Sequence, residues 1–424
     1  MLAPVKGGLD RPLLNPDSRL ESTEPALRLV AGQSVVAPEV AVLSPRIAEF
    51  FETAALDNPC LAMDVGLVEA AYRALARAFS GARVHYAVKA NPADAVVSRL
   101  VGAGSAFDCA SIAEIKLCLR HGAAPSEIGY GNTIKKERDI AAAHALGVRL
   151  FAFDSAAELE KIARAAPGAT IFCRVLTDGE GAEWPLSRKF GCDIAMAEAL
   201  LIRAAALGLD AAGVSFHVGS QQTDVESWRP VLKQVAGLFS RLEAQGLSPR
   251  LINLGGGMPA RYSNPVADIA AYGTAVMAAV HEIFAERSPD YPLELMVEPG
   301  RGLVGDAGVI QAEVVLVSRK SADDVVRWVY LDIGKFSGLA ETMDEAIKYR
   351  LLTSRDGDGG ARGPVILAGP TCDSADVLYE RAKYDLPFGL RDGDKVWIMG
   401  AGAYTATYAS VGFNGFAPLE TVCV

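Results

Sequence analysis

The stretch Val84-His-Tyr-Ala-Val-Lys-Ala-Asn-Pro92 ends an apolar run of strand-forming residues with a single lysine. Asn91-Pro92 stops the strand and turns the chain, so Lys89 is expected at or near the C-terminal tip of a buried strand. An amine in that position is partly desolvated, which lowers its pKa and frees it to attack a carbonyl. Taken alone, a lysine that ends a strand and reaches water is the commoner case. The interpretation therefore depends on residues elsewhere in the chain.

Short strand-like runs alternate with helical stretches on both sides of Lys89. The expected strands span residues 60–64, 84–88, 106–108, 128–131, 150–153, 170–175, 212–217, 251–254 and 293–297. A strand followed by a helix, repeated along the chain, is typical of parallel βαβ units, and about eight such units close a barrel. The sequence therefore predicts an α/β fold built on a TIM-like (β/α)8 barrel.

After Arg301 the pattern changes to strands separated by Gly, Asp and Pro turns, with only short helices between them. The expected strands span residues 309–318, 327–332, 364–367, 395–398 and 421–424. Such a pattern predicts a C-terminal β-rich domain, either a sandwich or a small barrel. The expected domains are a poorly ordered extension over 1–38, a segment joining the β domain over 39–59, the barrel over 60–306 and the β domain over 307–424.

Composition and charge narrow the class of protein. Half of the 424 residues are hydrophobic and 22% are charged, so a sizeable core is expected. The formal charge of −10 argues against a nucleic-acid surface and suits small cationic substrates. Seven cysteines stand singly without a CxxC pair, which argues against a disulfide framework or structural zinc. Neither a leader nor a membrane-spanning stretch is evident, so a cytoplasmic protein without a membrane partner is expected.

Unusual residues lie at the C-terminal ends of the expected barrel strands or just after them, where barrel enzymes place their active sites. They are Asp108, Arg174, His217, the triplet Gly255–Gly257 and Glu298-Pro-Gly-Arg301. Each taken singly is more often structural, but together with Lys89 they fit a phosphorylated aromatic aldehyde cofactor. The lysine would join the aldehyde, and a carboxylate would keep the ring nitrogen protonated. An imidazole would lie against the ring, while glycine amides and an arginine would hold the phosphate.

Seven motifs carry a resemblance to a known family: HYAVKANP, FDCAS, FHVGSQ, LGGGMPA, EPGRGL, GPTCDSAD and GAYTATYASVGFNGF. Over residues 40–424, in this order, the chain resembles the fold-type III, pyridoxal-phosphate-dependent basic amino acid decarboxylases. It is most similar to the ornithine decarboxylase group with its bacterial ornithine/lysine members. The resemblance implies an alanine racemase-like barrel with a β-rich domain, and pyridoxal 5′-phosphate as the cofactor.

The resemblance also implies roles around the cofactor. Lys89 would be the Schiff-base lysine, Glu298 the partner of the pyridine nitrogen and His217 the ring that stacks on the cofactor. Asp108 and Arg174 would support the lysine and the ring oxygen. The remaining residues expected to bind the cofactor, mainly at its phosphate, are Ser220, Gly256, Gly257, Gly300, Arg301 and Tyr404.

In the resembled enzymes the segment corresponding to Gly369–Asp376 comes from the neighbouring subunit, so a homodimer with shared active sites is expected. Cys372 would return a proton to the substrate Cα after carbon dioxide leaves, because the pKa of a thiol lies near the working pH. Asp373 would bind the distal ammonium of the substrate. Lys189 and Asp376 are candidates for an ion pair between the subunits.

The length of the substrate is less sharply indicated. Eukaryotic members carry an Asp in a short helix that corresponds to residues 339–347, so Asp344 or Glu345 would read the distal amine here. Phe413 is a further expected substrate contact. One methylene is worth only about 1–3 kcal/mol in a pocket, so L-ornithine is favoured with L-lysine close behind. The products would be putrescine and cadaverine, which feed polyamine biosynthesis.

Other activities share parts of this pattern. A diaminopimelate decarboxylase has similar lysine, glycine and EPGR motifs but carries Cys-Glu-Ser where this chain has Cys372-Asp373-Ser374. An alanine-racemase-type enzyme shares the barrel but lacks the Cys-Asp segment. A catalytically inactive, partner-binding relative, as the antizyme inhibitors are, usually loses cofactor residues that this chain retains.

Overall fold

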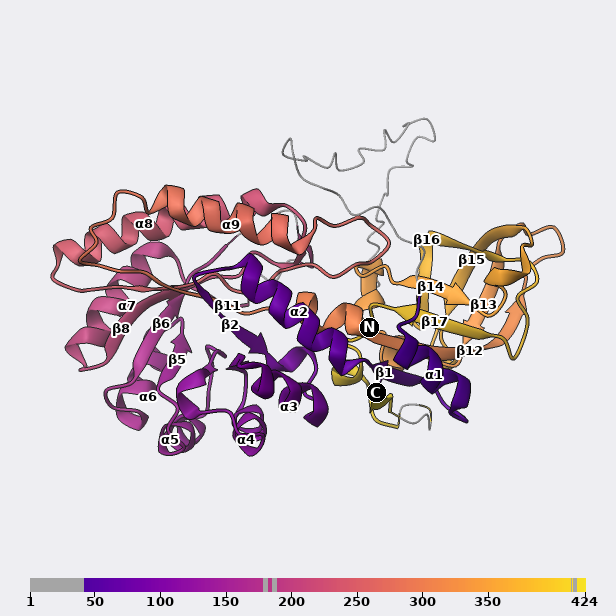
Figure 1. The fold of residues 1–424 in the computed structure, drawn as a ribbon, viewed down its shortest axis with the longest axis horizontal. Coiled ribbons are helices and arrows are strands. Elements are labelled where there is room, and N and C mark those ends of the chain that lie inside the picture. The colour runs from indigo at the N-terminus through magenta and orange to yellow at the C-terminus, as the bar shows by residue number, and fades with distance from the viewer. Residues whose placement is uncertain (1–41, 178–181, 185–188, 413, 415–417) are drawn as a thin grey trace, which may run out of the picture. The chain divides into compact units, whose positions relative to one another are not determined.

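The computed structural model describes residues 42–177, 182–184, 189–412, 414 and 418–424. The expected extension over 1–38 lies outside these residues. Within them the chain forms a closed barrel and an eight-stranded sheet (Figure 1). Among the helices described, none has both the length and the apolar character needed to cross a membrane.

Eight parallel strands close the barrel in the order β10-β11-β2-β3-β4-β5-β6-β8. Their bounds are β2 Ala82–Ala87, β3 Ala106–Cys109, β4 Ile128–Tyr130, β5 Leu150–Phe153, β6 Thr170–Arg174, β8 Asp210–Ser215, β10 Leu251–Asn253 and β11 Glu294–Val297. The predicted barrel is confirmed. Its strands come from short apolar runs of sequence, as expected for a parallel sheet that is buried on both faces.

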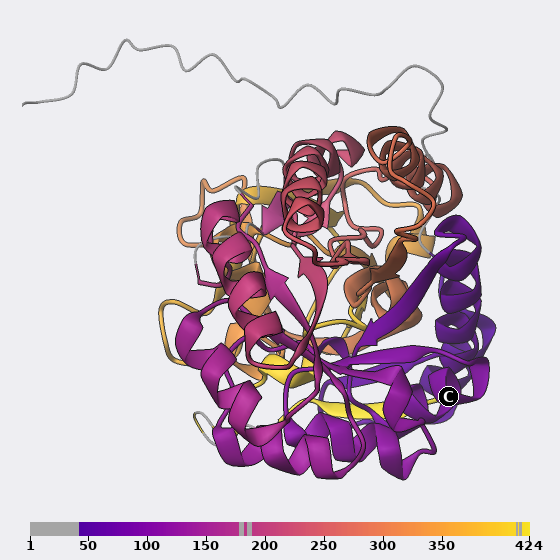
Figure 2. The same ribbon diagram turned by 90° about the vertical axis from the view of Figure 1, so that its left-hand side faces the viewer.

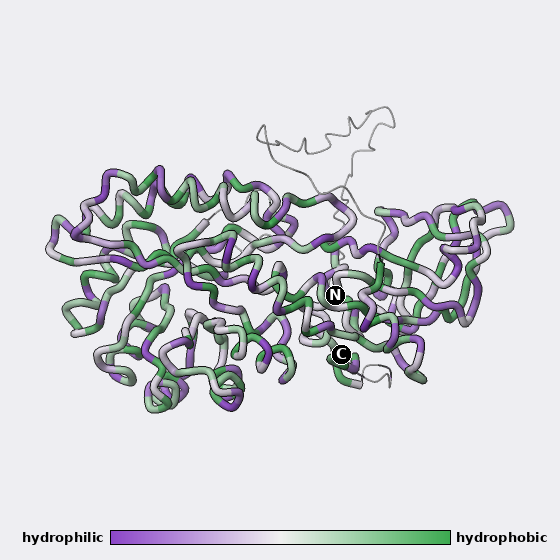
Figure 3. Tube along the Cα trace, in the orientation of Figure 1, coloured by the Kyte–Doolittle hydropathy of each residue, from purple (hydrophilic) through white to green (hydrophobic). Residues whose placement is uncertain are grey.

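Helices surround the barrel strands (Figure 2). Their bounds are α2 Val65–Ala78, α3 Asp94–Ala103, α4 Ile112–Arg120, α5 Glu137–Ala145, α6 Ala156–Ala165, α7 Ile194–Ala206, α8 Trp228–Ala244 and α9 Ile269–Ile283. Hydrophobic and hydrophilic residues alternate along these helices (Figure 3), as expected where one face packs on the barrel.

Side-chain caps fix where several of these helices begin. The backbone N–H of Gly66 donates to the Asp64 carboxylate at 2.9 Å, and that of Glu114 donates to the Ser111 hydroxyl at 3.3 Å. Such acceptors satisfy N–H groups that the first turn of a helix leaves free. The caps therefore set the lengths of the loops that lie between strands and helices.

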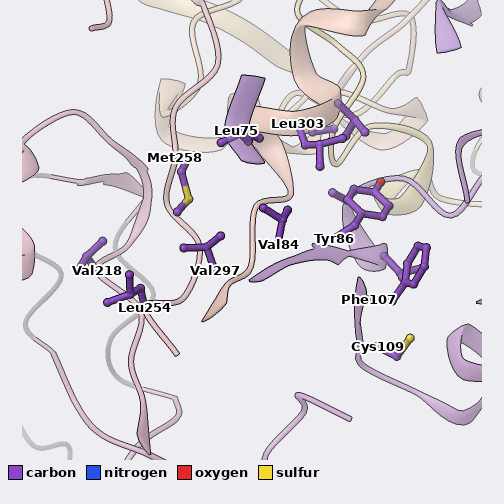
Figure 4. Packing of buried hydrophobic residues seen from close by; sticks show 14 of the residues in the cluster. Leu75, Val84, Tyr86, Phe107, Cys109, Val218, Leu254, Met258, Val297 and Leu303 are labelled. Carbon is purple, nitrogen blue, oxygen red and sulfur yellow. The ribbon is translucent and has the colours of Figure 1, made fainter. Parts of the chain in front are cut away.

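Two hydrophobic clusters lie on opposite sides of the barrel wall. Phe151 and Phe153 of β5 belong to the main cluster, whereas Ala152 between them belongs to a separate one. Successive residues of a strand point to opposite faces, so the separate cluster fills the barrel interior. Its buried members are Ala152, Phe172, Ala212, Leu251 and Met296. Figure 4 shows part of the main cluster, with Val84 and Val297 of paired strands near Leu75 of α2.

The second sheet has the order β14-β17-β12-β13-β15-β16, and β1 and β18 extend it beside β12. The bounds are β1 Cys60–Met63, β12 Gly308–Ser318, β13 Arg327–Leu331, β14 Arg350–Thr353, β15 Arg362–Ala368, β16 Val377–Pro387, β17 Lys395–Met399 and β18 Glu420–Cys423. The predicted β-rich C-terminal domain is confirmed. Helix α1 (Pro45–Thr53) contributes Ile47 and Phe51 to a small core with Ala62, Val309 and Met399.

The expected start of the barrel at residue 60 needs correction. Strand β1 pairs antiparallel with β12 and parallel with β18, so residues 60–63 belong to the second sheet. A four-residue apolar strand buried along its whole length carries no period that would indicate which sheet it joins. The barrel strands begin with β2.

Short elements complete the described chain. They are η1 Val88–Ala90, η2 Pro125–Glu127, β7 Ala182–Trp184, β9 Ser220–Gln222, η3 Val225–Ser227, α10 Arg301–Val304, η4 Gly305–Ala307, η5 Lys335–Ser337, η6 Ala340–Glu345, η7 Asp356–Asp358 and η8 Ala406–Tyr408. Among them, η1, β9, α10, η6 and η8 contribute residues to the cavity described next.

Candidate active site

A cavity of about 380 Å³ lies at the C-terminal ends of the barrel strands. Its wall includes every residue that the sequence analysis expected to bind the cofactor: Lys89, Asp108, Arg174, His217, Ser220, Gly256, Gly257, Glu298, Gly300, Arg301 and Tyr404. Residues far apart in the chain therefore meet at one place, because parallel strands bring their C-terminal ends to the same side of a barrel.

Lys89 follows β2 in the short turn η1 and reaches the cavity with its amine. Its Nζ lies 3.5 Å from Asp108 Oδ2. Burial lowers the pKa of Lys89, but Asp108, Tyr404 and Glu298 outweigh burial, so the pKa lies above its ordinary value. The expected lowering of this pKa was wrong for the chain by itself, since the sequence pattern did not reveal how many acidic groups face the amine.

Asp108 lies one residue before the end of β3 with almost no exposed surface, and the residue after β4 leaves room for its carboxylate. A Cβ at Gly131 would lie 1.9 Å from Asp108 Oδ1. Glycine at that position therefore allows the carboxylate to stand between β3 and the loop after β4, where it can contact Lys89. The sequence analysis did not single out Gly131.

Glu298 follows β11 and is held by Asn253 at the end of β10. Asn253 Nδ2 donates to Glu298 Oε1 at 2.5 Å, while Asn253 Oδ1 accepts from the Gly255 N–H at 2.9 Å. Burial, followed by the charge of Asp108, raises the pKa of Glu298 to about 7. Asn253 was missed by the sequence analysis, although a polar residue inside the apolar run Leu251–Leu254 was a usable signal.

His217 presents a neutral ring to the cavity. Its Nδ1 accepts the backbone N–H of Gly219 at 3.0 Å, so the ring proton is carried by Nε2. Burial, followed by the positive charges of Arg174 and Lys89, lowers the pKa of His217 to about 3. A neutral imidazole of this kind can lie flat against an aromatic ring.

Gly255, Gly256 and Gly257 form a loop without side chains beside His217, called the glycine cradle below. A Cβ at Gly256 would lie 2.8 Å from the Glu298 carbonyl oxygen and 3.1 Å from His217 Nε2. Gly257 has a φ of +106°, which side-chain-bearing residues rarely adopt, and a Cβ there would lie 2.6 Å from the Gly219 oxygen. The loop therefore exposes backbone amides, which are good donors to a phosphate.

Arg301 is the buried cation of the cradle, and it has a partner that the sequence analysis missed. Its Nη1 and Nη2 each donate to one oxygen of Glu341 at 2.7 Å. Its Nη1 also donates to Tyr262 Oη at 2.9 Å, and its Nε to Ser220 Oγ at 3.1 Å. Glu341 belongs to η6, so the second sheet region supplies one wall of the cavity.

Asp344 and Glu345 lie outside the described cavity wall, and their contact with a substrate amine stays a prediction. Glu341 of the same segment is part of that wall. Both oxygens of Glu345 accept backbone N–H groups of residues 380–382, at distances of 2.7 to 2.8 Å. Glu345 thus ties η6 to β16. Phe413 lies outside the described residues.

Cys372 and Asp373 do not meet the cavity of their own chain. Both are exposed in the turn between β15 and β16, where the Ala375 N–H donates to Asp373 Oδ1 at 2.8 Å. Asp376 is 2% exposed, and its carboxylate accepts the N–H of Lys335 at 2.8 Å. Asp376 therefore organises this turn internally, and its ion pair with a second copy stays a prediction.

A buried ion-pair cluster stands behind the cavity wall formed by residues 131–133. Lys135 Nζ lies 3.0 Å from Glu158 Oε1, and Lys161 Nζ lies 2.5 Å from Glu158 Oε2. Lys135 also donates to the Asn132 and Ala152 carbonyls at 2.8 and 2.6 Å. Burial, partly offset by Glu158, lowers the pKa of Lys135 to about 8. This cluster holds the loop after β4 in place.

The donors in the cavity fit a phosphorylated pyridine aldehyde. An amine, a carboxylate fixed by an amide, a neutral imidazole and bare glycine amides face one space. Each of these groups has a counterpart among the functional groups of pyridoxal phosphate.

Comparisons with known proteins agree with this chemistry. Residues 65–305 match the family model of the pyridoxal-dependent decarboxylases, pyridoxal binding domain. The lysine/ornithine decarboxylase of Selenomonas ruminantium is 32% identical over 385 residues, which are 91% of this chain and 92% of that protein. Antizyme inhibitor 2 of Xenopus laevis is 31% identical over 363 residues, 83% of this chain and 78% of that protein.

Solved structures share the fold over most of the chain. The Selenomonas ruminantium lysine decarboxylase in complex with PLP and cadaverine superposes with a TM-score of 0.79 at 30% identity, covering 91% of this chain and 95% of that one. Identity at this level across both domains extends the match beyond the barrel. The chain therefore belongs to the fold-type III pyridoxal-phosphate-dependent decarboxylases and is a carboxy-lyase that uses pyridoxal phosphate.

Proposed function

We propose that this carboxy-lyase removes the α-carboxyl group of L-ornithine to give putrescine, and accepts L-lysine less well. The observation that carries the proposal is the cavity where Lys89, His217, Glu298 and the glycine cradle meet. The similarity to a lysine/ornithine decarboxylase over nine-tenths of the chain supports a substrate with an amine at the far end. The diamine product would feed polyamine biosynthesis.

Pyridoxal phosphate, when bound, supplies an aldehyde carbon and a protonated ring that accepts the electron pair left on Cα when carbon dioxide departs. Lys89 would hold the cofactor covalently and would later release the product amine. Its neighbour Asp108 accepts from Nζ at 3.5 Å and keeps the amine directed into the cavity.

Glu298 would hold a proton at the ring nitrogen. Its orientation is set by Asn253, which donates to Oε1 from the adjacent strand end. His217 would lie against the face of the cofactor ring as a neutral imidazole, because burial lowers its pKa to about 3. Arg174 is half-buried in the same wall and would contact the ring oxygen.

Cys372 and Asp373 would act in the cavity of a second copy, making the enzyme a homodimer with shared sites. Both side chains are exposed in their own chain and are absent from its described cavity wall, which supports a role elsewhere. Cys372 would deliver a proton to Cα after carbon dioxide leaves. Asp373 would bind the distal ammonium, because a desolvated carboxylate discriminates strongly for a charged partner.

The test is carbon dioxide release from a panel of L-ornithine, L-lysine, L-arginine and diaminopimelate, with added cofactor. We expect the highest kcat/KM for ornithine, within about 10- to 200-fold of lysine, since the two differ by one methylene. Turnover of diaminopimelate above both diamino acids would overturn the proposal.

The matched control is Lys89→Ala. This variant should fold, should lose the absorbance of the lysine-linked cofactor near roughly 420 nm, and should lose activity. Retained absorbance together with activity would show that another group carries the cofactor.

A second candidate is a partner-binding protein without catalysis, and the similarity to antizyme inhibitor 2 favours it. The retained Lys89, Glu298 and Cys372 argue for the enzyme instead. Purified protein that neither gains cofactor absorbance nor releases carbon dioxide would support this second candidate.

A further inference from the structure

Most of the N–H donors of the Arg301 guanidinium already have acceptors within the protein. A guanidinium carries five N–H donors. The Nε group donates to Ser220 Oγ at 3.1 Å, and Nη1 donates to Tyr262 Oη at 2.9 Å. Nη1 also donates to Glu341 Oε2, and Nη2 donates to Glu341 Oε1, both at 2.7 Å. Among the described residues this leaves one N–H, on Nη2, for an incoming ligand.

The charge of Arg301 is also balanced before any ligand binds. Arg301 and Glu341 each expose 3% of their side chains, so their bidentate pair is shielded from solvent. Aromatic rings close the remaining sides, with the Tyr404 centroid 5.0 Å and the Tyr262 centroid 5.8 Å from Arg301 Cζ. A buried pair of this kind keeps its geometry, because leaving either partner alone is strongly unfavourable.

The position of Glu341 is itself fixed. It lies in η6, where its carbonyl oxygen accepts the Ile347 N–H at 3.1 Å. Its neighbour Thr342 is fully buried, and the Thr342 hydroxyl donates to the Leu339 carbonyl at 2.7 Å. The carboxylate therefore cannot easily leave the guanidinium when an anion arrives.

We propose that Glu341 is a resident counter-anion of the phosphate site. It assembles the guanidinium of Arg301 in the empty enzyme and competes with the cofactor phosphate for the same positive charge. Neutral donors, including the bare glycine amides, then carry most of the hold on the phosphate. The proposal rests on the proposed placement of the cofactor phosphate at Arg301 and the glycine triplet.

The direction of the effect follows from charge. A carboxylate and a phosphate that share one guanidinium repel each other, and in a buried site this repulsion is screened less than in water. Removing the negative charge while keeping an acceptor for Arg301 should therefore tighten phosphate binding. Glu341 thereby limits how tightly the enzyme holds its cofactor.

The experiment compares Glu341→Gln with the wild type, both as cofactor-free protein, using PLP, pyridoxal and inorganic phosphate as probes. Pyridoxal lacks the phosphate but makes the same covalent link, so the ratio of the two affinities isolates the phosphate contribution. We expect the ratio to rise about tenfold in Glu341→Gln, with pyridoxal binding unchanged. Inorganic phosphate should raise the melting temperature of Glu341→Gln more than that of the wild type.

The matched control is Glu158→Gln, which also breaks a buried ion pair but lies behind the loop after β4. It should lower the melting temperature of the empty enzyme without changing the ratio of PLP to pyridoxal affinity. An equal shift of that ratio in both variants would reduce Glu341 to a structural role and overturn the proposal.

The remaining outcomes separate this proposal from the one it rests on. A wild type that binds PLP no more tightly than pyridoxal would refute the placement of the phosphate. An unchanged or lower ratio in Glu341→Gln, with a normal wild type, would refute the role of Glu341 alone. If Glu341→Gln does not fold, Glu341→Asp retracts the charge by one methylene and should raise the ratio by a smaller factor; an unchanged ratio there also overturns it.

Discussion

Charges of opposite sign line the same cavity, and each alters the pKa of the other. Burial alone would discharge both Lys89 and Glu298. The two groups instead stabilise each other's charge, since Glu298 raises the pKa of Lys89 and Lys89 lowers that of Glu298. Asp108 acts on both, raising each pKa. The acidic neighbours therefore stabilise the charged form of Lys89.

The raised pKa of Glu298 predicts a pH-dependent loss of stability in the cofactor-free enzyme. The pKa rises from 4.5 to about 7, so the folded chain binds more protons than the unfolded chain between these values. The stabilising contribution is fully present below pH 4.5 and is lost as the pH rises through about 7. Its size is roughly 3 kcal/mol before the discount for screening through the cavity.

Glu298→Gln should remove this contribution. Urea unfolding of the cofactor-free protein at pH 5 and at pH 8 measures it, because the variant should lose less free energy of unfolding across that interval than the wild type. Identical losses in the two proteins would contradict the raised pKa.

At the level of residues, the sequence predicted the side chains that stand at strand ends and missed those that hold them. Lys89, His217 and Glu298 follow apolar strands, and the barrel brings such positions together. Asn253 is the last residue of β10 but stands within an apolar run of the sequence, and Glu341 lies in a segment that contains three other acidic or polar candidates within a few residues. Only the turn of η6 decides which of those carboxylates faces Arg301.

At the level of elements, β8 and β10 approach each other closely in the barrel wall. Gly213 of β8 pairs with Leu251 of β10, and a Cβ at Gly213 would lie 1.9 Å from the Leu251 carbonyl oxygen. A register shift beside Ile171 and Phe172 of β6 precedes this close approach. Glycine in a strand often marks such a contact between backbones.

Gly213→Ala should therefore destabilise the barrel. The added methyl group cannot be accommodated without moving β8 away from β10, so we expect a loss of about 2–4 kcal/mol. The control is Gly102→Ala in α3, where nothing lies within 4 Å of the added Cβ. That change should stabilise the helix by about 0.5–1 kcal/mol. Equal unfolding midpoints for the two variants would contradict the close approach.

The order of the elements was predictable, but their partners were less so. The alternation of strands and helices indicated the barrel because each unit repeats the same local pattern. Strand β1 has the same apolar composition as the barrel strands, yet it pairs with β12 and β18. Local sequence fixes that a strand forms, whereas the choice of sheet depends on distant partners.

At the level of the whole molecule, the proposed sharing of active sites makes a prediction about mixed dimers. If Lys89 of one chain and Cys372 of its partner form one site, a dimer of Lys89→Ala with Cys372→Ala contains one intact site. Random pairing makes half of the molecules mixed, which gives about a quarter of the wild-type activity after co-expression.

Carbon dioxide release from the unfractionated co-expressed protein measures this recovery, and mixed dimers purified through two different tags should show about half of the wild-type activity. Each variant expressed alone supplies the baseline. Mixed dimers that show no more activity than the average of the two baselines would place Cys372 outside the partner's site. The sequence could suggest this sharing only through resemblance, because no pattern within one chain records which cavity an exposed turn will enter.

The position of β1 has a consequence for biosynthesis. During translation β1 leaves the ribosome before the barrel, and β12 and β18 emerge only after it. Pairings between such distant segments form slowly and leave apolar strands unprotected in the meantime. Cys60–Met63 therefore has no strand partner, and is open to binding by chaperones, until the barrel has been synthesised. The nascent chain can close its barrel while still attached, but the second sheet is completed only later.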